Sequence, residues 1–172
     1  MQYDKNNDLL KLPRHGTLIQ YEGVGVLLTG DSGVGKSETA LSMIDQGGKL
    51  VCDDAPVFSY QHTKVVGKCD KHFAGLLHIR QLGILNIAEC YPEQEAFLLE
   101  SELHLIIHLQ PVLSLSDSEV PVIYDRPLYE EIIVADDVIY KLTLLLYERN
   151  NIALLVKTAI KQFKANCEER CN

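Results

Sequence analysis

The stretch that most constrains this chain is a glycine-rich loop, Gly-Asp-Ser-Gly-Val-Gly-Lys-Ser, at residues 30–37. It fits the pattern G-x-x-x-x-G-K-[S/T] at every fixed position. Glycines at such positions let the backbone turn with positive φ and approach an anion without an intervening Cβ. Successive backbone N–H groups then point inward and form a nest for a phosphate. The pattern therefore predicts a phosphate-binding loop.

The segments on either side of this loop supply the context that the motif requires. Before it, Val24–Thr29 is a short apolar run of the kind found in buried strands. After it, residues 38–46 have the apolar spacing of a helix, and the glycines at 47 and 48 predict its end. Residues 49–52 predict the next strand. This order favours a P-loop α/β domain, in which the helix N-terminus faces the bound phosphate.

We expect the whole loop and the residue after it to bind the phosphates of a nucleotide. These residues are Gly30, Asp31, Ser32, Gly33, Val34, Gly35, Lys36, Ser37 and Glu38. The Lys36 ammonium would reach the outer phosphates, and the Ser37 hydroxyl would ligate Mg²⁺. The alternative is a glycine turn without a ligand, and the flanking strand and helix favour phosphate binding over it.

Two adjacent carboxylates, Asp53 and Asp54, directly follow the predicted strand over residues 49–52. P-loop enzymes often place a metal ligand or a general base at this point. A polar turn is the alternative, because aspartate is common in turns. With a phosphate-binding loop upstream, we favour the functional interpretation.

A hairpin is predicted immediately before the glycine-rich loop. Residues 17–21 form a strand-like run, and Glu22-Gly23 is a turn that would pair this run with Val24–Thr29. His15 would then lie at the end of a strand beside the phosphate-binding loop. It is either a residue of the site or a solvated loop histidine, and its position alone favours the latter.

The composition predicts a single domain and disfavours two classes of partner. A chain of 172 residues can bury one sizeable core, and we expect residues 1–13 to form a flexible N-terminal arm. The formal net charge of −8 argues against a nucleic-acid-binding surface. No apolar run reaches the length of a membrane span, and the polar start of the chain does not resemble a secretory signal.

The five cysteines, at positions 52, 69, 90, 167 and 171, are scattered and include no Cys-x-x-Cys pair. This spacing indicates neither a zinc site nor a disulfide framework. It favours reduced, mostly structural thiols in a cytoplasmic protein.

The rest of the chain alternates short β-type runs with one amphipathic segment. Strands are predicted over residues 57–60, 64–66, 103–109 and 140–147, with further β-type sequence at 73–80 and 83–87, and a helix over 150–164. His104 and His108 fall on one face of their strand. We interpret both as packing or solvent-side histidines, and the apolar stripe of the last helix as core or a subunit contact.

Together these segments resemble the catalytic domain of the bacterial HPr kinase/phosphorylase family over roughly residues 15–165. The most specific likeness is the stretch from Gly23 to Leu41, which is similar to the family's P-loop segment beyond the general motif. Shorter matches are His15-Gly16, Val51–Asp54, Leu77–Ile84, Tyr124-Asp125-Arg126, Lys141–Thr143 and Arg149-Asn150. The resemblance implies an α/β fold of the HPr kinase/PEP carboxykinase-like type, with a mixed β-sheet core and flanking helices. It further implies a short form that lacks the family's N-terminal domain.

The same resemblance implies an ATP- and Mg²⁺-dependent kinase that phosphorylates a serine of HPr, a carrier protein of the sugar phosphotransferase system. It also implies the reverse phosphorolysis by inorganic phosphate, a cytoplasmic location and a homo-oligomer, by analogy a hexamer. Carried over by position, Asp53 would be the general base, Lys36 would neutralise the phosphates and Arg126 would stabilise the transferring phosphate. His15 would lie beside the phosphate loop, and Ser37 and Asp54 would hold Mg²⁺.

The chain departs from the family pattern in and around the expected metal site. His78 stands where the family signature has a glutamate that is implied to bind Mg²⁺, and Gln81 stands where it has a glycine. Residues 91–97 replace a glycine- and alanine-rich loop, and Tyr147-Glu148 replaces a Pro-Gly pair. These departures favour an alternative, a nucleotide-sensing module of the same fold without turnover. A P-loop kinase for another protein or a small metabolite is a further alternative.

Overall fold

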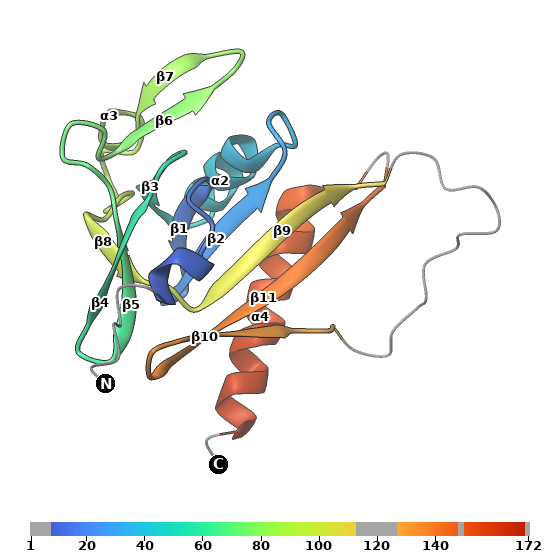
Figure 1. The fold of residues 1–172 in the computed structure, drawn as a ribbon. Helices are drawn as coiled ribbons and strands as arrows, with labels where there is room; N and C mark the ends of the chain where they lie inside the picture. Colours follow the sequence, from blue (N-terminus) through green and yellow to red (C-terminus); the bar gives the residue numbers. More distant parts are fainter. Residues whose placement is uncertain (1–7, 113–126, 148–149, 171–172) are drawn as a thin grey trace.

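A six-stranded mixed sheet forms the centre of the molecule in this computed structural model, which describes residues 8–112, 127–147 and 150–170. The strand order is β10-β11-β9-β2-β1-β3 (Figure 1). The strands are β1 (Thr17–Tyr21), β2 (Val24–Gly30), β3 (Lys49–Cys52), β9 (Leu105–Pro111), β10 (Glu130–Val134) and β11 (Asp137–Leu146). Strand β9 pairs in parallel with β2 and β11, whereas β1 is antiparallel to β2 and β3, and β10 to β11.

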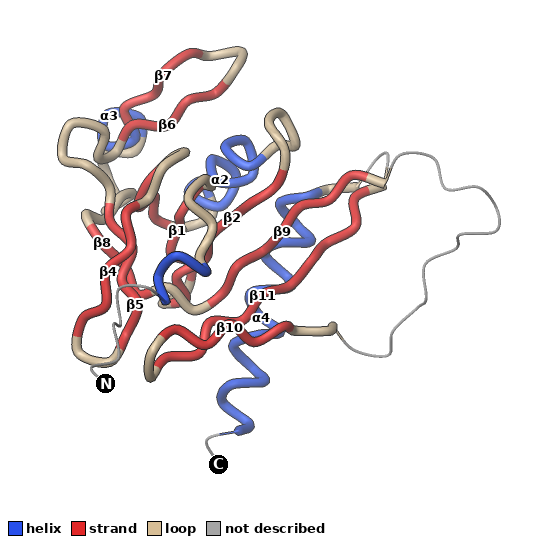
Figure 2. Tube along the Cα trace, in the orientation of Figure 1, coloured by secondary structure: helices blue, strands red, loops and turns tan. Residues whose placement is uncertain are grey.

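Two helices cover one face of this sheet, α2 (Lys36–Asp45) and α4 (Ile152–Arg170), as Figure 2 shows. Their apolar sides pack on the sheet and on each other in one core cluster, which includes Met43, Ile44, Val156 and Ile160, all fully buried. The apolar stripe of α4 is therefore core, as one of the two interpretations proposed. Among the described residues, no helix is long and apolar enough to cross a membrane.

A smaller three-stranded sheet covers the opposite face with a short 3₁₀ helix. It consists of β4 (Val57–Gln61), β5 (Lys64–Lys68) and β8 (Glu100–Glu102), and the 3₁₀ helix η1 is Leu9–Lys11. Leu12 is buried in this second core cluster, and the Asp8 carboxylate accepts a hydrogen bond from the Ala135 backbone N–H. The expectation of a flexible arm over residues 1–13 is therefore wrong for residues 8–12, because Leu9 and Leu12 pack in the second core cluster.

The β-type sequence around the family signature forms a two-stranded hairpin, β6 (Leu76–Ile79) and β7 (Gly83–Asn86), followed by a single helical turn, α3 (Ile87–Cys90). Leu77 and Ile79 anchor β6 in the core formed with α2. His78, between them in sequence, faces away from that core and is exposed.

The predicted elements agree well with the observed ones near the glycine-rich loop and less well toward the C-terminus. The hairpin β1–β2 and the helix α2 are confirmed, and β3 has the predicted bounds. Strand β10 was not predicted, and α4 continues beyond residue 164. His104 and His108 are packing histidines: His104 Nδ1 accepts the Gly25 N–H at 3.0 Å, and His108 Nδ1 lies 3.1 Å from the Thr29 hydroxyl.

Candidate active site

The directions of three neighbouring strands bring the predicted site residues to one edge of the sheet. Strands β2 and β3 run the same way, because each is antiparallel to β1, which lies between them. The glycine-rich loop after β2 and the aspartates after β3 therefore emerge at the same edge. Strand β1 begins at this edge, so the segment 15–17 lies between the loop and the aspartates.

The glycine-rich loop has the backbone conformation that its sequence predicts. Gly33 and Gly35 have φ values of 82° and 101°, which favour glycine, and Gly35 immediately precedes α2. The Lys36 ammonium donates hydrogen bonds to the Gly30 and Asp31 carbonyls, both at 2.9 Å. The ammonium is thus held over the loop. A bound phosphate would offer the ammonium charged oxygens in place of these neutral carbonyls. Hydrogen bonds to charged oxygens are the stronger of the two.

Asp53 is the most highly connected carboxylate of the site. Its Oδ1 accepts hydrogen bonds from the Thr17 hydroxyl at 2.8 Å and the Ser37 hydroxyl at 3.2 Å. Its Oδ2 accepts the backbone N–H of His78 at 3.0 Å. Donors from β1, the start of α2 and β6 therefore fix this side chain beside the loop.

Asp54 and His15 form an exposed pair at the rim of the site. The His15 Nδ1 lies 3.9 Å from Asp54 Oδ1, and the two side chains are 80% and 84% exposed. Such a pair is screened by water and contributes little to stability. The backbone ties the two segments together more firmly, because the Gly16 N–H donates to the Asp54 carbonyl at 2.8 Å. A Cβ at Gly16 would lie 2.5 Å from the Leu28 carbonyl oxygen, so this approach requires glycine.

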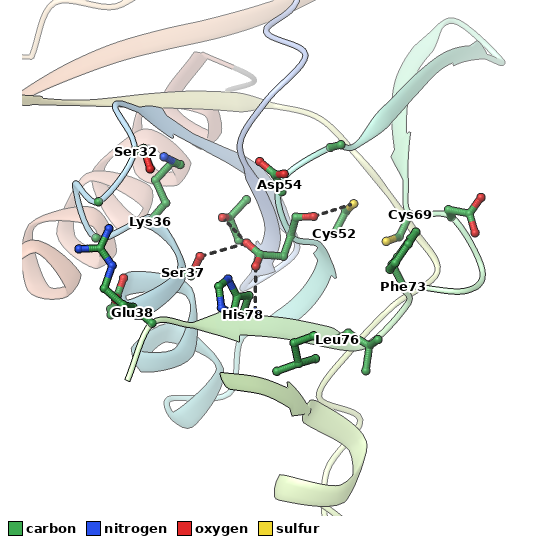
Figure 3. A pocket seen from close by; sticks show the side chains of 18 residues that line it. Ser32, Lys36, Ser37, Glu38, Cys52, Asp54, Cys69, Phe73, Leu76 and His78 are labelled. Atoms are coloured by element: carbon green, nitrogen blue, oxygen red, sulfur yellow. Dashed lines mark hydrogen bonds between the residues drawn. The ribbon is translucent and has the colours of Figure 1, made fainter. Parts of the chain in front are cut away.

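These segments enclose a cavity of about 560 Å³ between the loop and the β6–β7 hairpin (Figure 3). Its lining includes Ser32, Gly33, Gly35, Lys36, Ser37, Glu38, Thr17, Asp53 and Asp54. The hairpin contributes His78, Arg80 and Ile84. The Arg80 guanidinium reaches over the loop, since it lies 3.4 Å from where a Cβ would stand on Gly33. The cavity thus combines phosphate-binding groups with a fixed carboxylate, and His15 is not part of the lining.

The wall of the cavity opposite the loop is less polar. Cys52, Cys69, Phe73 and Leu76 lie on it. The Cys52 thiol donates to the Asp53 carbonyl at 3.6 Å. Burial, together with the neighbouring Cys69 thiol, raises the pKa of Cys52 above its usual range. Cys52 is therefore a protonated thiol under ordinary conditions.

The oxygen atoms at this edge are of the type that Mg²⁺ prefers. The Ser37 hydroxyl and the carboxylates of Asp53 and Asp54 all line the cavity. Among the described residues, no cluster of three or more histidine, cysteine, aspartate or glutamate side chains is arranged as a metal site. Mg²⁺ needs no such cluster, because it is usually held by one or two carboxylates, substrate phosphates and water. The residues present therefore fit a magnesium ion that is bound together with a nucleotide.

Two residues of the site were not singled out from the sequence. Thr17 looked like an ordinary strand residue, and only the pairing of β1 with β3 places its hydroxyl on Asp53. Arg80 was part of a signature segment without a role of its own, and the turn of the β6–β7 hairpin brings it over the loop. The sequence signal that could have identified Arg80 is its positive charge in a segment that resembles a family signature. Arg126, which was expected to stabilise the phosphate, lies outside the described residues.

The fold and the site together define a P-loop α/β protein. Its mixed sheet carries a strand–loop–helix phosphate motif, and a pair of carboxylates follows strand β3. The sequence matches the HPr Serine kinase C-terminal domain over residues 10–170, and the chain belongs to that family. The expected fold type is confirmed by a solved structure, the Hpr(Ser) kinase/phosphatase from Coxiella burnetii. It superposes with a TM-score of 0.79 at 27% identity, covering 91% of this chain and 92% of the other.

Curated relatives give the same family at somewhat higher identity. The HPr kinase/phosphorylase of Clostridium acetobutylicum is 32% identical over 158 residues, which is 91% of this chain and 50% of the relative. That of Clostridium tetani is 33% identical over 154 residues, 88% of this chain and 48% of the relative. The chain thus spans about half the length of these relatives.

Proposed function

We propose that this protein is an ATP-dependent serine kinase whose acceptor is HPr of the sugar phosphotransferase system. The observation that carries the proposal is the fixed carboxylate of Asp53, hydrogen bonded to the Ser37 hydroxyl at the end of the phosphate-binding loop. A carboxylate held here could accept a proton next to the position where the loop would hold the terminal phosphates. Family membership and the names of the relatives support the choice of acceptor.

The two oxygens of Asp53 have different roles in this proposal. Oδ1 already accepts two hydroxyl donors, which use both of its lone pairs, whereas Oδ2 accepts one N–H among the described residues. We therefore assign the proton transfer to Oδ2. It takes the proton of the acceptor serine while the serine oxygen forms a bond to the γ-phosphorus, and the bond from phosphorus to the ADP oxygen breaks.

The remaining groups of the site bind and orient the phosphates. The loop N–H groups and the Lys36 ammonium hold the β- and γ-phosphates, and Arg80 lies close enough to the loop to add a further cation. Arg126 and His15 keep the roles that the family implies for them. Mg²⁺, held by Ser37 and Asp54, would supply neutralisation of the phosphate charge. In the phosphorolysis, an oxygen of inorganic phosphate forms a bond to the phosphorus of phosphoserine, and the bond from phosphorus to the serine oxygen breaks. Protonated Asp53 gives its proton to that serine oxygen, and pyrophosphate is released.

A second candidate function is a nucleotide-sensing module without turnover. It is favoured by His78, an exposed imidazole at the cavity where the family signature has a glutamate. A neutral imidazole is a poor ligand for Mg²⁺. In this case ATP would bind with an affinity that depends on Lys36, and no phosphate would be transferred.

Transfer of label from γ-labelled ATP to purified HPr tests the first proposal. We expect labelled HPr in the presence of Mg²⁺, loss of label with Asp53→Asn and a smaller loss with Asp54→Asn. No transfer at any Mg²⁺ or Mn²⁺ concentration, with ATP binding retained, would favour the sensing module instead. By family analogy alone we also propose a cytoplasmic location and a homo-oligomeric state. Sedimentation of the purified protein tests the oligomeric state.

A further inference from the structure

Two cysteines from different parts of the chain meet on the wall of the candidate active site. Cys52 is the last residue of β3, Cys69 directly follows β5, and these two strands contact each other. Both side chains belong to the same apolar cluster and line the same cavity. Their sulfur atoms face the same part of the cavity in Figure 3.

We propose that Cys52 and Cys69 are a redox modification site, in which a peroxide converts the two thiols into a disulfide and thereby switches off the site beside them. The disulfide itself does not depend on the proposed function. Its effect on phosphate transfer rests on that function.

The different exposure of the two thiols assigns them different parts in this reaction. Cys69 is half-buried and opens on the cavity, so a molecule as small as hydrogen peroxide reaches its sulfur, whereas Cys52 is 3% exposed. The other described cysteines lie elsewhere, Cys90 on α3 and Cys167 on α4. Cys52 is thus the described thiol that is placed to react with an oxidised Cys69.

The chemistry is balanced with the peroxide as the only oxidant. The Cys69 sulfur attacks one peroxide oxygen, the O–O bond breaks, and Cys69 becomes a sulfenic acid while one water is released. The Cys52 sulfur then attacks the Cys69 sulfur, loses its proton and displaces the hydroxyl as a second water. Two thiols are oxidised to one disulfide, and one peroxide is reduced to two waters. A dithiol such as dithiothreitol reverses the reaction.

The disulfide would act on Asp53 because Cys52 is its neighbour in the chain. Oxidation removes the thiol hydrogen that bonds to the Asp53 carbonyl, and it ties the end of β3 to the segment after β5. The Asp53 side chain must stay within hydrogen-bond reach of Ser37 and Thr17 to keep its position. The phosphate-binding loop follows β2 and is not attached to either cysteine. Oxidation should therefore impair transfer much more than nucleotide binding.

The test uses the full chain with Cys90→Ser, Cys167→Ser and Cys171→Ser, so that only the proposed pair remains. After treatment with hydrogen peroxide, intact mass should show the loss of two hydrogens, and peptide mapping should join the peptides that contain Cys52 and Cys69. Dithiothreitol should restore the original mass. Transfer to HPr should fall by about 100-fold, the scale expected when a catalytic group is displaced by about 1 Å, while ATP affinity changes less than about threefold.

The matched control is Cys69→Ser, which removes the pair and leaves the Cys52 hydrogen bond to Asp53 in place. Its transfer activity should resist peroxide. An unchanged protein mass after peroxide treatment would overturn the proposal, and so would sulfinic acid at Cys69 without a crosslink to Cys52. If the reduced protein transfers no phosphate, the proposed function fails, and the mass and mapping data still decide whether the disulfide forms.

Discussion

The Thr17 hydroxyl donates a 2.8 Å hydrogen bond to Oδ1 of Asp53, joining the first residue of β1 to the residue that follows β3. Thr17 is 1% exposed, so water does not replace its hydroxyl if that group is removed. With the Ser37 hydroxyl it occupies Oδ1, whereas Oδ2 accepts one hydrogen bond among the described residues, from the His78 N–H. The relationship explains how a carboxylate on an irregular turn keeps one orientation.

Replacing Thr17 by valine, which has nearly the same shape, should slow phosphate transfer without loss of ATP binding. We expect a decrease of about tenfold in kcat, because a hydrogen bond to a charged group contributes about 1.5 kcal/mol or more. Steady-state kinetics with varied ATP and HPr give the measurement. Thr17→Ser keeps the hydroxyl and should recover most of the rate, and equal losses in the two variants would contradict the assigned role.

Lys36→Ala should abolish measurable ATP binding and leave the fold intact. Within the part of the chain that the structure describes, the ammonium donates hydrogen bonds only to carbonyls of its own loop, so its removal breaks no core contact. Titration calorimetry with ATP and thermal unfolding of the same sample check both parts. Lys161→Ala, which removes a half-exposed lysine on α4 that pairs with Glu22, is a matched control and should bind ATP normally. Unchanged ATP affinity in Lys36→Ala would place the nucleotide elsewhere.

His78→Glu should lower the Mg²⁺ concentration needed for half-maximal transfer. The side chain lines the cavity, and glutamate would add a hard oxygen ligand where histidine offers none that Mg²⁺ prefers. The hydrogen bond to Asp53 comes from the backbone of residue 78, so the substitution leaves it in place. His78→Ala serves as the control and should retain the original Mg²⁺ dependence. An unchanged dependence in His78→Glu would show that this side chain does not approach the metal.

His104 should make the stability of the protein depend on pH just below neutrality. Burial lowers the pKa of His104 below the ordinary value of 6.5, against a smaller opposing effect of Glu102. The unfolded chain therefore binds a proton at a higher pH than the folded one. The contribution of uncharged His104 to the free energy of unfolding is fully present above pH 6.5. It is lost as pH falls from 6.5 through the lowered pKa.

Urea unfolding between pH 7.5 and 5.5 measures this effect. The free energy of unfolding should decrease with a slope of at most about 1.4 kcal/mol per pH unit for one histidine. His104→Gln should flatten the profile, whereas His62→Gln, in the exposed β4–β5 turn, should not. Identical slopes in the two variants would contradict the assignment to His104.

The part of the fold that local sequence determines was predicted well. The glycine-rich loop, α2 and β3 follow from apolar spacing and from glycines that end or turn the chain, and these signals act within a few residues. Strand β10, in contrast, is a short edge strand with two glutamates and partial burial, and its pairing with β11 stabilises it more than its own sequence does. The packing of residues 8–12 on the second sheet face likewise depends on contacts with distant strands.

The candidate site shows the same division. The motif identifies the phosphate-binding loop and the strand end identifies Asp53, but neither indicates that the Thr17 hydroxyl and the His78 backbone N–H hold that carboxylate. Both contacts depend on strand pairing and on the position of the β6–β7 hairpin. The sequence predicted the pairing of Ser37 with Asp54 at a metal, whereas the direct contact of Ser37 in the structure is with Asp53. The metal role of Asp54 stays a prediction.

The most direct test of the account is the intact mass of HPr after incubation with this protein, ATP and Mg²⁺. We predict the addition of one phosphate, mapped to a serine, with no addition when Asp53→Asn replaces the wild-type protein and ATP binding by that variant retained. HPr that stays unmodified with the wild-type protein, or that is modified equally well by Asp53→Asn, would contradict the central claim that Asp53 accepts the serine proton in a kinase reaction.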